Sequence, residues 1–506
     1  MTEPTEPRPN ESAGPPRAVQ NMIRGSTWMI AARWAMRLIG LVSTMILARL
    51  LAPDDFGLVA VALLAYGLLE TISYAGVDLA LMRPGHETRA HYDTAWTIQV
   101  VQGVFIALCL FAAAPFVAAY FGEPRALAVT CWIAARAPIE GLQNIGVVAF
   151  RKELDFAKEF RFTLVNKLLG FVAVVGAALW LRNYWALVFG SLVGSALAVW
   201  LSYRMHPYRP RLSLACFSQL WAFSQWLVIS RVGSYLNRKC DEFVVGGHAG
   251  TAAMGAYHVA NEIATLPSTE IVMPVRRAMF PTLAKVSSHA EEYSRAVLSS
   301  FSAVSAVCLF VSCTLALIAP DFVALVLGSK WPEAAPLMRW LALFGGFSAL
   351  ILVLEVPLWV AGKTQLSALQ SWVELALIVP LSLLAVRLWG AEGVAATRAG
   401  VALVMMPLMM ALTARAGLVG FLALASALWR PAVAAAGMAG LVVCLPLHVI
   451  GFALVRLLVA GAACALSYPA LLLLLWWASG RPAGIEQALL RHAGALWRRF
   501  VTPHTS

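Results

Sequence analysis

The sequence predicts an all-α integral membrane protein with about 14 transmembrane helices. Of its 506 residues, 60% are hydrophobic and only 13% are charged, which is far more apolar surface than one soluble core covers. The apolar residues come in runs of about 20, the length at which a helix crosses a bilayer. The sequence lacks the roughly ten-residue segments of alternating polarity that are typical of a spanning β-barrel, so we expect helical spans.

The spans follow one another with short connections. Residues 1–25 are rich in Pro, Glu and Arg and have no apolar core of a signal peptide, so we expect a disordered cytoplasmic tail. A tight turn from Ala52 to Gly57 separates the first two spans. The expected spans are 26–51, 57–76, 92–120, 126–149, 160–181, 184–203, 217–245, 252–275, 295–319, 334–361, 364–388, 392–414, 431–450 and 452–478.

The charges between the spans indicate the orientation. With a cytoplasmic N-terminus, most loop cations lie inside, and the outside segments hold only Arg49, Arg125, Arg182, Lys330 and Arg387. Cytoplasmic loops carry the excess of Lys and Arg in membrane proteins, so this bias predicts that both termini are cytoplasmic. The same rule accounts for the net charge of +12 without nucleic acid as a partner.

The chain also matches itself when it is shifted by 198 residues. The shift places Trp28 on Trp226, Arg33 on Arg231 and Gly57 on Gly255. Six spans separate the two copies, so they enter the membrane in the same direction, as in a parallel repeat. We therefore expect a six-helix half at 26–212, a second at 213–415, two additional helices within 416–480, and a cytoplasmic amphipathic tail at 481–506.

Cations inside the spans mark a candidate site. Arg33 and Arg37 lie one turn apart in the first span, where a cation costs at least ~2.5–3.5 kcal/mol and usually faces a bundle interior or a watery cavity. In the seventh span Arg231, Tyr235, Arg238 and Glu242 share one face, with Lys239 and Asp241 beside it. Because the arginines recur in the repeat and outnumber the carboxylates on their helices, we expect them to bind an anion.

Other polar stripes extend this expected hydrated cavity. They comprise Tyr66, Glu70 and Tyr74 in the second span, Arg136, Glu140 and Gln143 or Asn144 in the fourth, and His258 and Glu262 in the eighth. Each has a structural alternative: Arg136 and Glu140 suit an internal ion pair, and His258 suits a packed polar residue. We expect Lys167, Arg398 and Arg456 to reach an interface by snorkelling, and Glu355 and Glu374 to be protonated and hydrogen-bonded within the bundle.

Three segments carry a resemblance to a known family. They are GSTWMIAARWAMRLIGLVSTMILARLLAPDDFGLVAVALL from Gly25, AGVDLALMRP from Ala75 and GSKWPEAAPLMRWLA from Gly328. The sequence resembles the Wzx-type polysaccharide exporters of the MOP superfamily, and in particular the branch of the colanic-acid and succinoglycan exporters. The resemblance covers about residues 24–480. It implies two six-helix bundles in a V around a central cavity, often with two further helices.

The resemblance also implies an activity. Members flip an undecaprenyl-pyrophosphate-linked oligosaccharide, an exopolysaccharide or O-antigen repeat unit, across the bacterial inner membrane by alternating access. The expected ligands of the pyrophosphate and sugars are Arg33, Arg37, Arg231, Arg238, Lys239, Tyr235 and Tyr66. The candidates for proton or cation coupling are Asp241, Glu242, Glu262 and Glu70. A polysaccharide polymerase or copolymerase is a possible partner.

Two other transport functions stay open at this stage. A flippase for a lipid-linked peptidoglycan precursor shares a cationic cavity, whereas a multidrug or cation antiporter of the superfamily needs one dominated by carboxylates. We do not expect an enzyme, because the long loops near 150–160 and 276–294 hold no catalytic constellation. The eight cysteines have no metal-ligand spacing, so we expect no metal or other cofactor. The sugar unit, the coupling ion and the oligomeric state cannot be derived from the sequence.

Overall fold

The computed structural model describes residues 17–74, 76, 81, 88–153, 155–217, 225–266 and 268–480. Within these residues the secondary structure is helical and contains no strand. Contacts divide the chain into two compact units. The first unit comprises Met1–Leu50, Tyr66–Ala113 and Val129–Val232, and the second comprises Leu51–Ala65, Ala114–Ala128 and Gly233–Ser506. We describe each unit separately.

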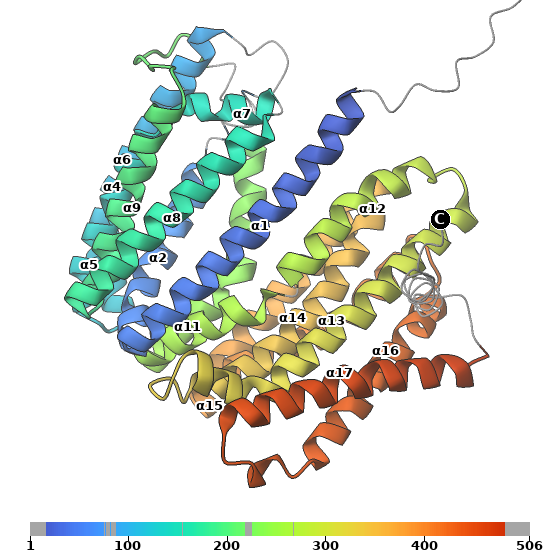
Figure 1. Cartoon of the computed structure of the whole chain (residues 1–506). Helices are drawn as coiled ribbons and strands as arrows, with labels where there is room; N and C mark the ends of the chain where they lie inside the picture. Colours follow the sequence, from blue (N-terminus) through green and yellow to red (C-terminus); the bar gives the residue numbers. More distant parts are fainter. Residues whose placement is uncertain are drawn as a thin grey trace, which may run out of the picture. The chain divides into compact units, whose positions relative to one another are not determined.

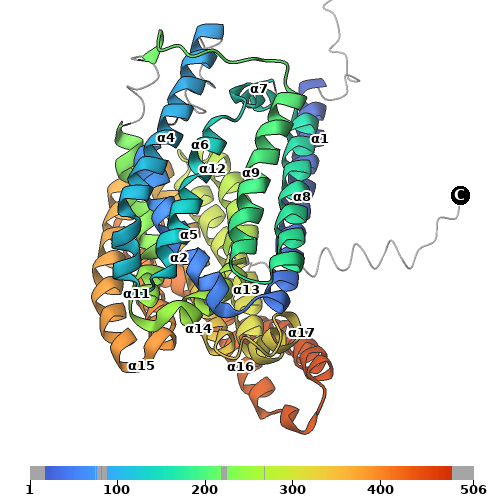
Figure 2. The same ribbon diagram turned by 90° about the vertical axis from the view of Figure 1, so that its left-hand side faces the viewer.

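In the N-terminal half, the residues that the structure describes form seven α-helices of six or more residues. They are α1 (Arg17–Leu50), α2 (Pro53–Ser73), α4 (Arg89–Tyr120), α5 (Arg125–Ala134), α6 (Arg136–Gly141), α8 (Phe156–Leu181) and α9 (Trp185–Met205). A short 3₁₀ turn η1 (Ile145–Val147) and α7 (Val148–Lys152) connect α6 to α8. In the first unit α8 packs against both α1 and α9, and the three helices run side by side (Figures 1 and 2).

Two boundaries differ from the expected ones. Helix α1 begins at Arg17, so residues 17–25 are helical rather than part of a disordered tail; this segment has no proline to interrupt the helical hydrogen bonds. The expected span 126–149 is not one helix, because α5 and α6 are separate and α6 contains Pro138. The chain then turns at Asn144, whose side chain accepts a hydrogen bond from the backbone N–H of Gly146 at 2.9 Å.

Helix α8 begins at a conventional cap. The side chain of Asp155 accepts a hydrogen bond from the backbone N–H of Lys158 at 3.1 Å. Hydrogen bonds from the Lys158 side chain and backbone hold the pKa of Asp155 below its usual value. The charged cap is therefore intact at neutral pH and is lost only as the pH falls through that lowered pKa.

The C-terminal half continues the same helical pattern. Its α-helices are α11 (Gln225–Ala264), α12 (Met273–Lys285), α13 (Ala290–Val326), α14 (Ala334–Val360), α15 (Thr364–Arg415), α16 (Phe421–Cys444) and α17 (Ala453–Ala478). A π-helical turn η2 (Ser268–Val272) precedes α12, and a 3₁₀ turn η3 (Leu447–Val449) precedes α17. Helix α16 begins at Phe421, ahead of the expected span at 431–450.

Two of these helices contain a sharp bend at a glycine. In α11 the bend lies at Gly250 with φ of 87°, and in α15 it lies at Gly390 with φ of 62°. Positive φ favours glycine because a side chain would clash with the backbone there. The bend in α15 separates the two expected spans 364–388 and 392–414.

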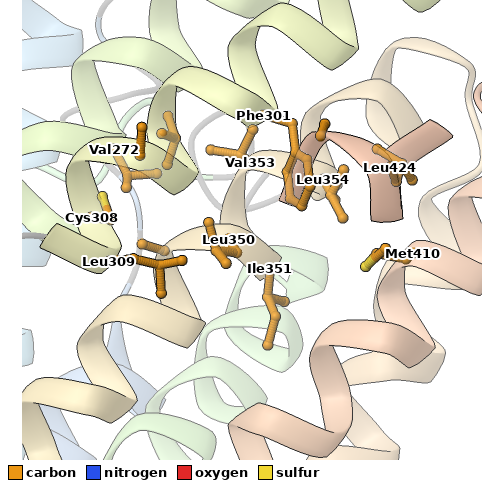
Figure 3. Packing of buried hydrophobic residues seen from close by; sticks show 14 of the residues in the cluster. Val272, Phe301, Cys308, Leu309, Leu350, Ile351, Val353, Leu354, Met410 and Leu424 are labelled. Carbon is orange, nitrogen blue, oxygen red and sulfur yellow. The ribbon is translucent and has the colours of Figure 1, made fainter. Parts of the chain in front are cut away.

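The core of the second unit lies among α13, α14, α15 and α16 (Figure 3). Phe301 of α13, Leu350 and Leu354 of α14, Met410 of α15 and Leu424 of α16 are all buried in one cluster. Nine helices in the described residues are long and apolar enough to cross a membrane, and one of them is the bent α15. The protein is therefore an all-α polytopic membrane protein, as expected.

A reciprocal backbone contact joins α2 and α11 within the second unit. A Cβ atom on Gly57 would lie 1.7 Å from the carbonyl oxygen of Thr251, and one on Gly255 would lie 1.9 Å from that of Pro53. The 198-residue shift relates Gly57 to Gly255 and Pro53 to Thr251. The contact of Gly57 with Thr251 is thus repeated by their counterparts, Gly255 and Pro53, as in a two-fold symmetric interface. Only glycine fits at both positions.

We expect Gly57→Ala and Gly255→Ala each to destabilise the protein by about 1–3 kcal/mol, because the new methyl group overlaps a backbone carbonyl that cannot rotate away. Thermal unfolding of the purified protein in detergent measures the effect. Gly400→Ala in α15 is the matched control, since nothing lies within 4 Å of its Cβ position. Equal unfolding temperatures for all three variants would contradict the close contact.

Candidate functional site

The first unit contains a cavity of about 540 Å³ lined by polar side chains. Helices α2, α4 and α6 contribute Tyr66, Glu70, Gln99, Gln102, Arg136 and Glu140 to it. Helices α1, α8 and α9 contribute Ser43, Asn166, Lys167, Ser191 and Ser195. These helices are otherwise apolar, and hydrogen-bonding groups inside a membrane helix bundle lie where they find a partner or water.

Glu140 is the best-connected group of the cavity. It accepts hydrogen bonds from the Tyr66 hydroxyl at 2.8 Å, from Arg136 Nε at 2.7 Å and from the Ser195 hydroxyl at 3.0 Å. The Arg136 guanidinium also lies 5.5 Å from the centre of the Tyr66 ring. The ion pair expected from the spacing of Arg136 and Glu140 is therefore present, and it lies on the wall of the cavity.

Lys167 of α8 lines the same cavity and is exposed, and its expected snorkelling to an interface stays a prediction. Its Nζ atom lies 4.0 Å from the Cβ position of Gly40 on α1, which is an ordinary van der Waals distance. Helix α1 packs against α8 here. Asn166, the preceding residue, lines the cavity too.

The charges of the cavity balance. Arg136 and Glu140 neutralise each other. Glu70 and Lys167 carry opposite charges, and neither makes a hydrogen bond or an ion pair with any residue that the structure describes. The cavity thus combines one internal ion pair with two charged groups open to a ligand. Its chemistry is rich in hydrogen-bond donors and acceptors rather than strongly cationic.

The sequence reasoning named Gln143 in the polar stripe of the fourth span but missed three other amides of this cavity. Gln99 and Gln102 lie in the expected span 92–120, and Asn166 lies in the expected span 160–181. Gln99 donates a hydrogen bond to the backbone carbonyl of Glu140 at 3.1 Å. An amide inside a transmembrane run is costly without a partner, and this signal, applied to every span, would have identified them.

A second group of charges is buried in the second unit, between α11 and α15. Arg398 Nη1 lies 2.6 Å from Asp241 Oδ1, and these side chains are 5% and 0% exposed. Tyr257 donates a hydrogen bond to Asp241 at 2.6 Å. Arg398 therefore does not snorkel, because its charge is neutralised by a buried carboxylate and its guanidinium lies 4.4 Å from the centre of the Phe344 ring.

Glu242, the neighbour of Asp241, is enclosed by a separate set of partners. It forms an ion pair with Lys239 and lies 3.2 Å from His258 Nδ1. Asn261 donates a hydrogen bond to the same carboxylate at 3.2 Å. The two candidate coupling carboxylates Asp241 and Glu242 thus have different neighbours although they are adjacent in sequence.

Two further expectations for buried charges need correction. Glu355 is not an isolated acid, because it forms an ion pair with Arg276 at 2.6 Å. Arg456 does not snorkel but pairs with Asp321 at 2.7 Å. Glu374 does accept a hydrogen bond within the unit, from Gln370 at 2.8 Å. Helix packing supplied partners that come from distant parts of the chain.

The remaining predicted residues are dispersed. Arg231 is exposed and its guanidinium lies 3.6 Å from the centre of the Tyr74 ring, within the first unit. The Tyr235 hydroxyl donates a hydrogen bond to the carbonyl of Leu64 at 2.8 Å in the second unit. Arg37 is half-buried in α1, and Arg238 and Glu262 are exposed. The side chain of Arg33 lies outside the part of the chain that the structure describes.

Comparison with known families identifies the chain. The profile of the polysaccharide biosynthesis protein family matches residues 46–336, more than half of the chain. The chain belongs to this family. Members of the polysaccharide biosynthesis family are transporters rather than enzymes, so the resemblance to polysaccharide exporters inferred from the sequence is confirmed.

Two curated relatives illustrate the family. The succinoglycan biosynthesis transport protein ExoT of Rhizobium meliloti (strain 1021) is 25% identical over 65% of this chain and 67% of its own length. The lipopolysaccharide biosynthesis protein WzxC of Escherichia coli (strain K12) is 26% identical over 64% of this chain and 67% of its own length. This chain is therefore a multi-pass membrane protein of a bacterial family.

Solved structures share the fold of this family member. The lipid II flippase MurJ in an inward closed conformation superposes with a TM-score of 0.70, at 12% identity, over 89% of this chain and 99% of MurJ. An inward-facing multidrug resistance MATE transporter of the MOP superfamily superposes with a TM-score of 0.58, at 14% identity, over 76% of this chain and 95% of that one. At these identities the likeness establishes the fold alone.

The buried pair of Asp241 and Arg398 generates a stability prediction. We expect Arg398→Gln to destabilise the protein by about 3–5 kcal/mol, because it leaves the Asp241 carboxylate buried without a countercharge. Thermal unfolding in detergent measures this loss. Arg295→Gln is the control, since its pairing with Glu291 is solvent-exposed and contributes about 0–1 kcal/mol.

The double variant Asp241→Asn/Arg398→Gln tests the cause of the loss. It removes both charges, so we expect it to be more stable than Arg398→Gln alone. A double variant that is less stable than Arg398→Gln would show that the charge pairing is not what the single change disrupts.

Proposed function

We propose that this transporter flips an oligosaccharide linked to undecaprenyl pyrophosphate from the cytoplasmic to the outer leaflet of the bacterial inner membrane. The observation that carries the proposal is the polar cavity of the first unit in a member of the polysaccharide biosynthesis family. A volume of about 540 Å³ is within the range of about 300–1,000 Å³ in which proteins bind small organic groups. The sugar part of the substrate is the natural occupant.

The lining of the cavity suits sugar hydroxyls. Each hydroxyl both donates and accepts hydrogen bonds, and the amides of Gln99, Gln102 and Asn166 do the same. The ring of Tyr66 adds an aromatic surface.

The lipid's pyrophosphate needs a different environment. It crosses hydrocarbon without its hydration water, and arginines replace that water with charge-assisted hydrogen bonds. We assign this role to Arg33, Arg37, Arg231, Arg238, Lys239 and Tyr235. The carboxylates Asp241, Glu242, Glu262 and Glu70 are the proposed groups for coupling to a proton or cation.

The proposal includes an architecture and a setting. We infer about 14 spans, two six-helix halves in a V around a central cavity, two additional C-terminal helices and cytoplasmic termini. Alternating access between the two faces of the membrane moves the substrate. A polymerase or copolymerase acting on the exported unit is the proposed protein partner.

We expect Arg231→Ala to abolish polysaccharide export while the protein stays in the membrane, because the pyrophosphate loses its countercharge. Arg231→Lys restores export only in part, since lysine lacks the planar fork of donors. Secreted polymer and accumulated lipid-linked precursor are measured in a strain deleted for this gene, with immunoblots for the protein in the membrane. Full complementation by Arg231→Ala would refute the role of this arginine.

The cavity makes an independent prediction. Asn166→Leu removes a hydrogen-bonding group from its wall without a change in charge, so we expect export to fall severalfold at unchanged protein levels. Thr163→Val, one turn earlier on α8, is the matched control: the Thr163 hydroxyl binds the Glu159 carbonyl on its own helix and does not line the cavity. Equal export by the two variants would contradict a role for the cavity in sugar binding.

The same strain distinguishes the main alternative. A flippase for a peptidoglycan precursor would, on loss of its activity, cause lysis and accumulation of the lipid-linked cell-wall precursor. We expect cells of the deletion strain to grow normally and to keep their normal shape. They should accumulate a lipid-linked oligosaccharide of the polysaccharide pathway instead.

A further inference from the structure

The contact between Arg231 and Tyr74 is the tightest cation and ring pairing in the described residues of the first unit. The guanidinium carbon of Arg231 lies 3.6 Å from the ring centre, compared with 5.5 Å for Arg136 over Tyr66 and 5.6 Å for Arg209 over Tyr203. A distance of 3.6 Å to the centre means that the guanidinium lies directly over the face of the ring.

This geometry fixes the arginine but leaves its hydrogen-bonding edge accessible. The five N–H donors of a guanidinium lie in its own plane, and a ring contacts only its face. Arg231 remains exposed in the structure. A stacked arginine has already lost much of its side-chain freedom, so it loses less when it binds an anion.

We propose that Tyr74 is a positioning residue that presents Arg231 to the diphosphate group of a prenyl-linked substrate. This rests on the proposed function, and it adds a residue to it. Helix α2 ends at Ser73, directly before Tyr74, and the positive-inside orientation places this end on the cytoplasmic side. A lipid-borne diphosphate lies at the headgroup level there, so Arg231 receives it on entry.

Binding of farnesyl pyrophosphate to the purified full-length protein in detergent tests the inference, with titration calorimetry as the measurement. The variants are Tyr74→Phe, which keeps the aromatic face, Tyr74→Leu, which removes it, Arg231→Gln, and the double variant Tyr74→Leu/Arg231→Gln. Tyr203→Leu is the matched control, because it removes the ring that lies under Arg209, another exposed arginine of this unit. Inorganic pyrophosphate and farnesol distinguish binding of the diphosphate from binding of the chain.

We expect Tyr74→Leu to weaken binding about three- to thirtyfold, and Tyr74→Phe and Tyr203→Leu to leave it within about twofold. In the Arg231→Gln background, Tyr74→Leu should have no further effect, because Tyr74 acts only through the arginine. Farnesol should not bind. The affinities of the variants for inorganic pyrophosphate should rank in the same order as their affinities for farnesyl pyrophosphate.

The outcomes separate the two levels of the proposal. If Arg231→Gln weakens binding but Tyr74→Leu behaves like Tyr74→Phe, the positioning role is refuted and the proposed function is unaffected. If Tyr74→Leu weakens binding equally in the Arg231→Gln background, Tyr74 has a general structural role and the inference fails. If the wild-type chain binds no diphosphate, or Arg231→Gln binds as tightly as wild type, the diphosphate site of the proposed function is refuted together with the inference.

Discussion

The constraint that organises this molecule is the absence of water in the hydrocarbon of a bilayer, where a charge or hydrogen-bonding group needs a partner from the protein or a wet cavity. The two units satisfy it differently. The first unit arranges its polar side chains around a cavity, so that they remain available to a ligand. The second unit buries Asp241 and Arg398 against each other, so that their charges cancel internally.

The substrate that we propose makes two different demands on the protein. A sugar needs many hydrogen bonds, and the polar wall around the ion pair of Arg136 and Glu140 can supply them. A diphosphate needs cations with free donors, and Arg231 over Tyr74 offers those near the end of α2. A lipid-linked sugar carries both groups, which supports the view that different parts of the protein receive them.

The internal repeat shows which features tolerate divergence. Gly57 and Gly255 have the same role in the two copies. Each lies against a backbone carbonyl of the other helix, where no side chain fits. Arg37 and its repeat counterpart Tyr235 have diverged, and the Tyr235 hydroxyl binds the Leu64 carbonyl within the second unit. The close backbone contact therefore explains why these two glycines agree, whereas the position of Arg37 and Tyr235 differs between the copies.

The sequence by itself determined the helical membrane class, the approximate position of most spans and the pairing of Arg136 with Glu140, because these depend on local hydrophobic runs and on spacing within one helix. Only the tertiary structure decided which distant groups meet. Arg398 and Arg456 both looked suited to snorkelling, yet one pairs with Asp241 and the other with Asp321. The direction of a charged side chain depends on the helices packed against its own, and that packing is not encoded in any single segment.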